Sequence, residues 1–265
     1  RTTDLNATIS RLEREAAERE RIGDALTVSR ERLKNISRPG IASIFPTLKG
    51  PVVVMDVGAN VDCRPQHLFQ FGVMASAFSQ VMFGGATRPR IGLLSIGEET
   101  GKGNLLVKRA HELFQKSTLN FIGNVEGRDT FQGDVDVIVC DGFVGNVCLK
   151  LSEGLAEAVI AMLREEIGKS IKAQVGYLFA KEAFTNFKKR VDYAEYGGAP
   201  LLGLNGTGII CHGRSNSLAI KNAIKIGAEL VREKVNDRIL TLLSESGNSP
   251  AGSDEPVGAK TGTVS

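Results

Sequence analysis

The sequence has no apolar run that approaches the roughly 18–20 residues of a membrane-spanning helix, and no signal peptide opens it. Its four cysteines (Cys63, Cys140, Cys148 and Cys211) form no CxxC pair. Cys140 and Cys148 lie in apolar runs, which is typical of small buried side chains in a reducing compartment. These absences predict a cytoplasmic protein.

Motifs for several common sites are also missing. No GxGxxG follows a predicted strand, no GxSxG occurs, and the stretch from Gly97 to Lys102 is one residue too short between its glycines for a Walker P-loop. The three histidines are scattered; we expect His111 on the surface of a helix and His212 near a cleft. With no clustered ligands, the sequence predicts no metal ion and no other cofactor.

The charge balance restricts the class of partner. The 265 residues carry a net charge of +3, with 42% hydrophobic and 24% charged residues, which is ordinary for a folded domain with a core. The mildly basic balance allows an acidic partner or an anionic membrane surface. Lysine and arginine do not cluster among aromatic residues, so nucleic acid is not a predicted partner.

Composition divides the chain into three zones. Residues 1–38 are rich in arginine and glutamate, and apolar residues from Leu5 to Leu26 recur at helical spacing, which predicts a charged amphipathic helix. We interpret it as a solvated surface helix or coiled-coil arm rather than a catalytic segment. Residues 39–245 form the predicted globular domain, and residues 246–265, rich in glycine, serine and proline, are predicted to be a disordered tail.

The globular zone alternates between apolar runs rich in β-branched residues and helical patterns. The predicted strands are Ile41–Phe45, Val52–Met55, Arg90–Leu94, Leu119–Ile122, Val135–Cys140, Leu201–Leu204 and Thr207–Cys211. The predicted helices are His67–Phe83, Asn104–Gln115, Val144–Lys172 and Ser215–Leu243. Continuous apolar strands that alternate with helices indicate an α/β fold with a mostly parallel sheet covered on both faces.

The loops after the predicted strands share one composition, with glycine beside asparagine, aspartate or glutamate. These loops are Asp56–Asn60, Ile96–Asn104, Gly123–Asp129, Asp141–Asn146 and Asn205–Gly208. Ligands of open α/β sheets bind beyond the carboxyl ends of strands. Glycine lets the backbone approach a ligand, and amide side chains both donate and accept hydrogen bonds. The series leaves two interpretations evenly balanced: ordinary turns, or one polar cleft that accepts an anion.

The same loops resemble motifs of the PlsX-type phosphate acyltransferases. The matching stretches follow the family's order from about Arg38 to Leu243: Asp56–Cys63, Ile96–Glu99, Phe121–Asp129, Asp141–Asn146, Tyr196–Gly206 and His212–Ile224. The resemblance implies a three-layer α/β/α fold like that of isocitrate and isopropylmalate dehydrogenases, and a homodimer. It also implies transfer of a fatty acyl group from acyl-carrier protein to inorganic phosphate, the first step of phosphatidic acid synthesis in bacteria.

In such a reaction phosphate is itself the nucleophile, so the protein has to hold an anion beside a thioester and stabilise the developing oxyanion. The predicted substrate-binding residues are Lys102 and Arg128, which suit phosphate, together with Glu98, Glu126 and His212. The predicted catalytic residues, which would position the thioester or donate to the oxyanion, are Asn60, Asn124, Asn146 and Asn205. Asp141 either takes part in catalysis or caps the helix that follows it.

The segment Ile167–Tyr193 mixes aromatic and basic residues, and the family resemblance places it at the tip of two protruding helices. Such a mixture suits peripheral contact with the inner face of the plasma membrane, or contact with acidic carrier protein. The residues predicted to make this contact are Tyr177, Leu178, Phe179, Phe184, Lys188 and Lys189. A packed pair of helices at a dimer interface is an equally good interpretation.

Two motifs of the family, Gly-Gly-Asp-His and Gly-Asn-Thr-Gly-Ala, are not found in this sequence, and the charged segment 1–38 stands in their place. Two interpretations therefore stay open: an active acyltransferase, and a non-catalytic dimerising scaffold that binds carrier protein or membrane. A third interpretation is a phosphotransacetylase-like enzyme that uses acyl-CoA.

Overall fold

The computed structural model describes residues 32–84, 87–191, 197–211, 213 and 215–247, except for the side chains of residues 188–191. The strands are β1 (Gly40–Pro46), β2 (Pro51–Met55), β3 (Ile91–Leu94), β4 (Phe121–Val125), β5 (Val137–Val139), β6 (Ala199–Leu202) and β7 (Gly208–Ile210). The helices are α2 (Pro65–Phe83), α3 (Leu105–Gln115), α4 (Gly142–Gly168), α5 (Ile171–Val191), α6 (Ser217–Arg232) and α7 (Val235–Glu245), with a 3-10 helix η1 (Gly127–Phe131). All seven predicted strands are present.

The strands form one sheet in the order β4-β3-β5-β2-β1-β6-β7. β4, β3, β5 and β2 are parallel to one another. β1 is antiparallel to both β2 and β6, so β6 runs in the same direction as β2, and β7 turns back against β6. Five of the seven strands therefore point the same way, which confirms the predicted α/β fold with a mostly parallel sheet.

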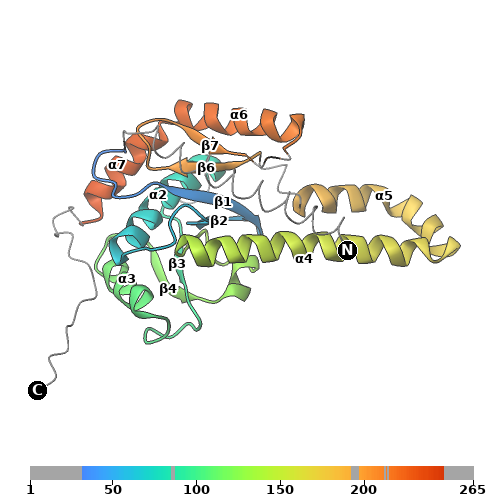
Figure 1. The fold of residues 1–265 in the computed structure, drawn as a ribbon, viewed down its shortest axis with the longest axis horizontal. Helices are drawn as coiled ribbons and strands as arrows, with labels where there is room; N and C mark the ends of the chain where they lie inside the picture. The colour runs from blue at the N-terminus through green and yellow to red at the C-terminus, as the bar shows by residue number, and fades with distance from the viewer. Residues whose placement is uncertain (1–31, 85–86, 192–196, 212, 214, 248–265) are drawn as a thin grey trace, which may run out of the picture.

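α2 is the central helix of the larger core. Every residue from His67 to Ser79 is buried, as expected for a helix that is apolar on all sides and packed on all sides. The helix lies on β2 and β5 and contacts α3, α6 and α7, and Figure 1 shows these helices on the same side of the sheet. Its contact with α3 is close, because a Cβ atom on Gly72 would stand 2.5 Å from the ring of Phe114.

A smaller apolar cluster covers the other face of the sheet. Strand side chains alternate between the two faces, so Val53 belongs to the larger core while Val52 and Val54 belong to this second cluster. Leu149 of α4 packs against the second cluster. α4 thus starts a helical layer on the face opposite α2.

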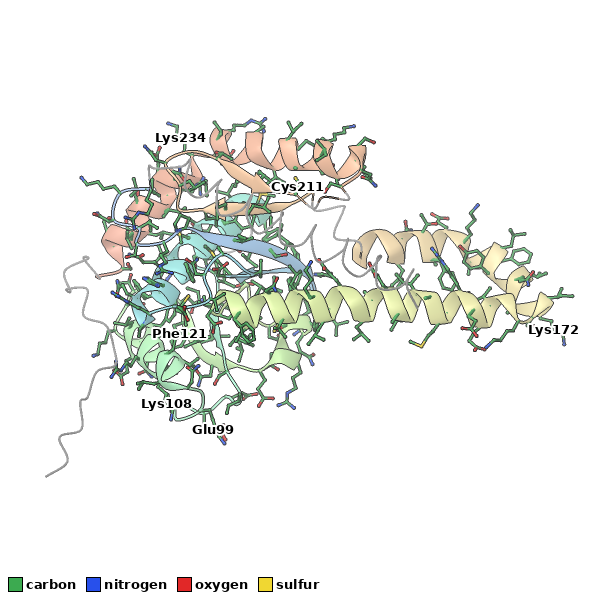
Figure 2. The ribbon with its side chains drawn as sticks, viewed as in Figure 1. Glu99, Lys108, Phe121, Lys172, Cys211 and Lys234 are labelled. Atoms are coloured by element: carbon green, nitrogen blue, oxygen red, sulfur yellow. The ribbon has the colours of Figure 1, made fainter. Side chains whose placement is uncertain are left out.

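α4 and α5 form a hairpin that projects from the body of the molecule (Figure 1). Figure 2 shows Lys172 at its far end. Many apolar side chains of this hairpin are exposed, including Leu151, Leu155 and Phe179. Even so, no helix in the described part of the chain combines the length and the hydropathy that crossing a bilayer requires.

The single helix predicted at Ser215–Leu243 is wrong, because the structure divides it into α6 and α7. The division occurs at Lys234, whose φ of 52° lies in the left-handed region (Figure 2). A straight helix of this length would extend about 44 Å, at a rise of about 1.5 Å per residue. The turn instead lets Leu230 of α6 and Ile239 of α7 enter the same core beside α2.

The predicted zones at the two ends of the chain lie mostly outside the described residues. Of residues 1–38, the structure describes those from Arg32 onward, and Leu33 and Ile36 are buried in the larger core. Of residues 246–265, it describes Ser246 and Gly247. Ser246 is buried and caps α7.

Candidate functional site at the carboxyl edge of the sheet

The five polar loops lie along one edge of the sheet. They stand at the ends of β2, β3, β4, β5 and β6, and these five strands share one direction. The predicted loop bounds differ from the structure, because residues 123–125 belong to β4, residues 142–146 to α4 and Gly208 to β7. Because β5 lies between β2 and β3, the loop that begins at Asp141 stands between those that begin at Asp56 and Ile96. Parallel strands thus bring together residues that are far apart in the sequence, at the edge where α/β proteins bind ligands.

Asp56 organises the loop after β2. Its carboxylate accepts hydrogen bonds from the backbone N–H groups of Ile41, Gly58, Ala59 and Asn60 at 2.7–3.1 Å. The residue is fully buried, and burial raises the pKa of its carboxyl group, while the hydrogen bonds from Ala59, Asn60, Ile41 and Gly58 lower it. A buried acceptor with this many donors fixes the course of the loop.

Asn60 is held inside this loop. Its side-chain amide donates to the carbonyl of Pro39 at 2.7 Å and to the Asp56 carboxylate at 2.8 Å. Both N–H groups of the amide are therefore used within the protein. The catalytic role predicted for Asn60 stays a prediction, and its visible contribution is to the shape of the loop.

The start of α4 packs directly on the same loop. The backbone N–H of Gly142 donates to the carbonyl of Asn60 at 2.7 Å. Asp141 caps the helix, because its Oδ1 accepts from the N–H groups of Phe143 and Val144, both at 3.0 Å. The first N–H groups of α4 are thus satisfied by the protein itself, which leaves little for an anion at this helix end.

Asn146 lies one turn into α4 and faces the loop after β2. A Cβ atom on Gly58 would stand 3.5 Å from its side-chain oxygen. The structure records no hydrogen bond of the Asn146 side chain to any other described residue. Of the predicted asparagines in this part of the edge, Asn146 is the one whose amide is available to a ligand.

Asn124 is buried at the end of β4 and holds the loop after β3. Its Nδ2 donates to the backbone carbonyl of Glu99 at 2.9 Å, and its Oδ1 lies 3.0 Å from Nδ1 of His111. His111 is only 4% exposed, so the predicted surface position is wrong. The reason is the spacing of α3: Val107, His111 and Phe114 share its inward face.

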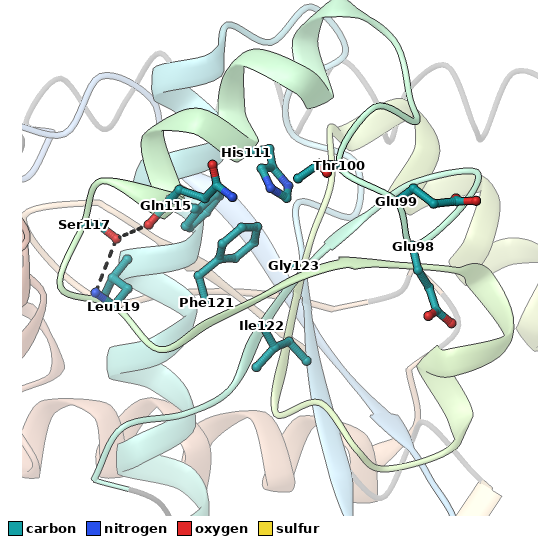
Figure 3. A pocket seen from close by; sticks show the side chains of 11 residues that line it. Glu98, Glu99, Thr100, His111, Gln115, Ser117, Leu119, Phe121, Ile122 and Gly123 are labelled. Atoms are coloured by element: carbon teal, nitrogen blue, oxygen red, sulfur yellow. Dashed lines mark hydrogen bonds between the residues drawn. The ribbon is translucent and has the colours of Figure 1, made fainter.

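A cavity of about 470 Å³ opens beside this histidine, between α3, β4 and the loop after β3. Figure 3 shows His111 and Phe121 together in the cavity and the carboxylates of Glu98 and Glu99 directed away from them. The lining residues are Glu98, Glu99, Thr100, His111, Phe114, Gln115, Ser117, Leu119, Phe121, Ile122 and Gly123. The cavity therefore combines an aromatic wall with polar groups at its rim.

Arg128 is surrounded by carboxylates. Its guanidinium lies 3.2 Å from Glu126 and 3.8 Å from both Glu98 and Asp129. The structure thus brings together three of the predicted substrate-binding residues, Arg128, Glu98 and Glu126. The group is exposed, so water screens these pairs, but an anion would still have to compete with three carboxylates for one cation.

Lys102 lies in the loop before α3, separated from the helix by Gly103 and Asn104, and forms no ion pair with any described residue. Its own N–H closes a turn by donating to the carbonyl of Glu99 at 2.9 Å. Asn104 caps the helix by accepting from Val107 at 2.9 Å. Among the described residues, the N–H groups of Leu105 and Leu106 have no acceptor. A lysine that shortly precedes a helix start with free N–H groups is a combination that suits an anion.

The remaining predicted residues lie elsewhere or outside the described part. Asn205 is exposed after β6, at the same edge as the other loops. His212 lies outside the described residues, and β7, which precedes it, ends at the opposite edge near Cys211 (Figure 2). Tyr177, Leu178, Phe179 and Phe184 lie on α5; Lys188 and Lys189 belong to the same helix, but their side chains lie outside the described part.

The cysteines near the edge are poor nucleophiles. Burial and the nearby Asp56 raise the pKa of the Cys63 thiol to about 12. Burial also raises the pKa of Cys140 and Cys148. These thiols are therefore protonated near neutral pH, and a thiol is far less nucleophilic than a thiolate.

Comparison with known proteins supports the resemblance. Residues 23–238 match the family described as "Fatty acid synthesis protein". A "Phosphate acyltransferase" from Syntrophotalea carbinolica is 58% identical over 80% of this chain and 61% of its own length. One from Geotalea uraniireducens is 56% identical over 82% of this chain and 62% of its own length. The chain therefore spans about three-fifths of these relatives.

A solved structure shows a weaker likeness. A branched-chain phosphotransacylase from Enterococcus faecalis V583 is 16% identical and covers 73% of this chain and 64% of its own, with a TM-score of 0.45.

Proposed function

We propose that this chain, which belongs to the fatty acid synthesis protein family of PlsX-type phosphate acyltransferases, moves a fatty acyl group from acyl-carrier protein to inorganic phosphate. The observation that carries the proposal is the gathering of the five polar loops at one edge of the sheet. The chain spans about 61% of the relative from Syntrophotalea carbinolica, so the proposal is argued from the chain's own loops. In this proposal they supply the anion-binding and hydrogen-bonding groups that the transfer requires.

The reaction requires no nucleophile from the protein. An oxygen of phosphate attacks the thioester carbon, the tetrahedral oxyanion collapses, the carbon–sulfur bond breaks, and the thiolate takes up the proton that phosphate gives up. The protonated thiols of Cys63 and Cys140 are compatible with this course, because neither has to attack. The protein contributes position and charge.

Lys102 and the start of α3 are our first choice for phosphate. Lys102 is exposed, has no ion-pair partner among the described residues, and precedes the free N–H groups of Leu105 and Leu106. Arg128 is the second choice, because it would have to leave Glu98, Glu126 and Asp129 to meet phosphate. We assign the oxyanion contact to Asn146, whose side chain is free to donate.

The exposed apolar face of α4 supports a homodimer. Val144, Val147, Leu151, Leu155 and Met162 recur at spacings of three, four or seven residues and are all exposed. They form one stripe about 27 Å long, at a rise of about 1.5 Å per residue. A stripe with this spacing is the pattern of a helix that packs against another helix, and we propose a second copy of the chain as its partner.

The first half of α5, residues 171–181 next to the far end of the hairpin, is called the hairpin tip. Its composition supports contact with an anionic surface. Phe179 is 88% exposed, Leu178 is also exposed, and Lys172 and Lys181 lie on the same helix. Apolar and basic residues together favour the interface of an anionic bilayer. We propose peripheral contact with the inner face of the plasma membrane, and acidic carrier protein is the alternative partner for the same tip.

The test is phosphate-dependent release of carrier-protein thiol from long-chain acyl-carrier protein by the purified chain, with acyl-phosphate trapped by hydroxylamine. We expect release only when phosphate is present. We expect Lys102→Ala to raise the KM for phosphate, and Lys108→Ala, an exposed lysine on α3 (Figure 2), to leave it unchanged.

Folded chain that releases no thiol would favour the alternative, a non-catalytic scaffold, which the exposed hairpin also supports. Faster release from acyl-CoA than from acyl-carrier protein would favour the phosphotransacetylase-like alternative.

A further inference from the structure

His111 is connected to Lys102 by three successive hydrogen bonds. Nδ1 of His111 lies 3.0 Å from Oδ1 of Asn124. Nδ2 of Asn124 donates to the backbone carbonyl of Glu99 at 2.9 Å. The same carbonyl accepts from the backbone N–H of Lys102, also at 2.9 Å. A helix, a strand and the loop before α3 thus meet at one buried amide.

The direction of each hydrogen bond follows from the carbonyl of Glu99. A carbonyl only accepts, so the amide group of Asn124 has to present its N–H to Glu99 and its oxygen to His111. Nδ1 of His111 must then carry a proton, because an amide oxygen only accepts. The orientation of Asn124 therefore depends on the donor that His111 supplies.

The histidine ring is fixed by its packing. It meets the ring of Phe121 edge-on at 4.9 Å, with an interplanar angle of 79°, and Phe121 stacks on Phe114 at 5.0 Å. Nε2 of His111 is buried and has no partner among the described residues. Within the described part of the chain, the ring therefore makes one hydrogen bond, the one to Asn124. A phenylalanine would fill the space without leaving a buried nitrogen unpaired, so packing alone does not account for a histidine.

We propose that His111 is a positioning residue that holds Lys102 in place through Asn124 and the carbonyl of Glu99. His111 does not touch phosphate in this scheme. It fixes the turn from Glu99 to Lys102. It thereby fixes the backbone of Lys102, which precedes the free N–H groups of α3. The kinetic consequence rests on the proposed function, whereas the effect on the loop does not.

Two substitutions separate the hydrogen bond from the packing. His111→Phe keeps an aromatic ring against Phe121 and removes the donor. His111→Asn keeps a donor close to the place of Nδ1 and removes most of the ring. Phe121→Leu is the matched control, because it loosens the same packing and leaves the hydrogen bonds in place.

The first measurement is hydrogen exchange of the backbone amides of residues 99–104 in the purified chain. We expect His111→Phe to speed this exchange about tenfold, because one buried hydrogen bond is lost. His111→Asn should stay within about threefold of wild type, since the donor is kept. The proposal is overturned if these amides exchange in His111→Phe as slowly as in wild type, or no faster than in Phe121→Leu.

The second measurement is the KM for phosphate in the thiol-release assay. We expect His111→Phe to raise it about tenfold with a smaller change in kcat, and His111→Asn to restore it. An unchanged KM with only a lowered Tm would assign His111 to packing and overturn the proposal. If wild type itself releases no thiol, the proposed function fails, and hydrogen exchange alone then decides the role of His111.

Discussion

Gly145 packs so closely on Asp56 that a Cβ atom on Gly145 would overlap the backbone carbonyl oxygen of Asp56. The contact joins the first turn of α4 to the loop after β2. Asp56 is the buried carboxylate that orders this loop, and the long helix that carries the hairpin starts against it. The position of the hairpin and the shape of the loop therefore require that residue Gly145 has no Cβ atom.

We predict that Gly145→Ala moves α4 or the loop and lowers the free energy of unfolding by about 1–3 kcal/mol, because backbone cannot yield as a side-chain end can. Thiol release should fall with it. Gly154→Ala on the same helix is the control, since a Cβ there meets no atom within 4 Å; it should gain up to about 1 kcal/mol from helix propensity. Equal effects of the two substitutions, measured by urea unfolding, would contradict the prediction.

The ion pair of Asp136 and Arg90, at the opposite edge of the sheet, makes the stability of the fold depend on pH. Arg90 donates to Asp136 through Nε at 3.0 Å and Nη2 at 2.9 Å. Burial raises the pKa of Asp136, but the hydrogen bonds and charge of Arg90 bring it below its ordinary value of 3.8. The pair therefore stabilises the fold above that value, and the stabilisation is lost as the pH falls through the lowered pKa.

We predict that Asp136→Asn lowers the free energy of unfolding by about 1 kcal/mol near neutral pH, a modest value because the pair is partly exposed. The difference from wild type should shrink as the pH falls below about 4. Urea unfolding of both proteins at neutral and at acidic pH measures it. A difference that is the same at both pH values would show that the charge of Asp136 is not responsible.

For the stripe on α4, we predict that Leu151→Glu weakens a homodimer at least tenfold, because it places a charge in an apolar helix contact. Glu157→Gln, at an exposed position about 120° around the same helix from Leu151, should leave association unchanged. Light scattering across a dilution series measures the mass. A wild-type chain that is monomeric at all concentrations would refute the homodimer.

For the hairpin tip, we predict that Phe179→Asp reduces binding to anionic lipid vesicles about tenfold or more, since it replaces an exposed apolar anchor with a negative charge. Val231→Asp, which changes an exposed valine on α6, is the matched control. Flotation with vesicles of phosphatidylglycerol measures the bound fraction. Equal flotation of the two variants would exclude the tip as the membrane contact.

Much of this arrangement could be predicted from local patterns. Val52–Met55 and Val135–Cys140 are apolar runs rich in β-branched residues. They coincide with β2 and β5, whose ends differ from the prediction by at most two residues. Asp141 stands before a helical pattern, and the cap, one of its two predicted roles, is present in the structure. These features depend on neighbours within a few residues, which the sequence displays directly.

The errors have a common cause. The helix predicted at Ser215–Leu243 continues in its pattern, yet it breaks at Lys234, because both halves have to reach the core beside α2. His111 has a polar side chain on a helix, which predicted exposure, yet the inward face of α3 buries it against Phe121. In both cases the deciding partner belongs to another element, α2 for the break at Lys234 and β4 for His111.

The sequence by itself determined the α/β class, the places of the strands, the polar loops that follow them and the family. Strand direction decided the rest, because only a sheet with five strands pointing one way sets Asp56, Asn124, Asp141 and Lys102 along one edge. Tertiary structure also decided which of these side chains are free: Asn60 and Asn124 are bonded within the protein, whereas Lys102 and Asn146 are open to a ligand. A local pattern specifies which groups a loop offers, and the packing of distant segments determines which of them are already satisfied.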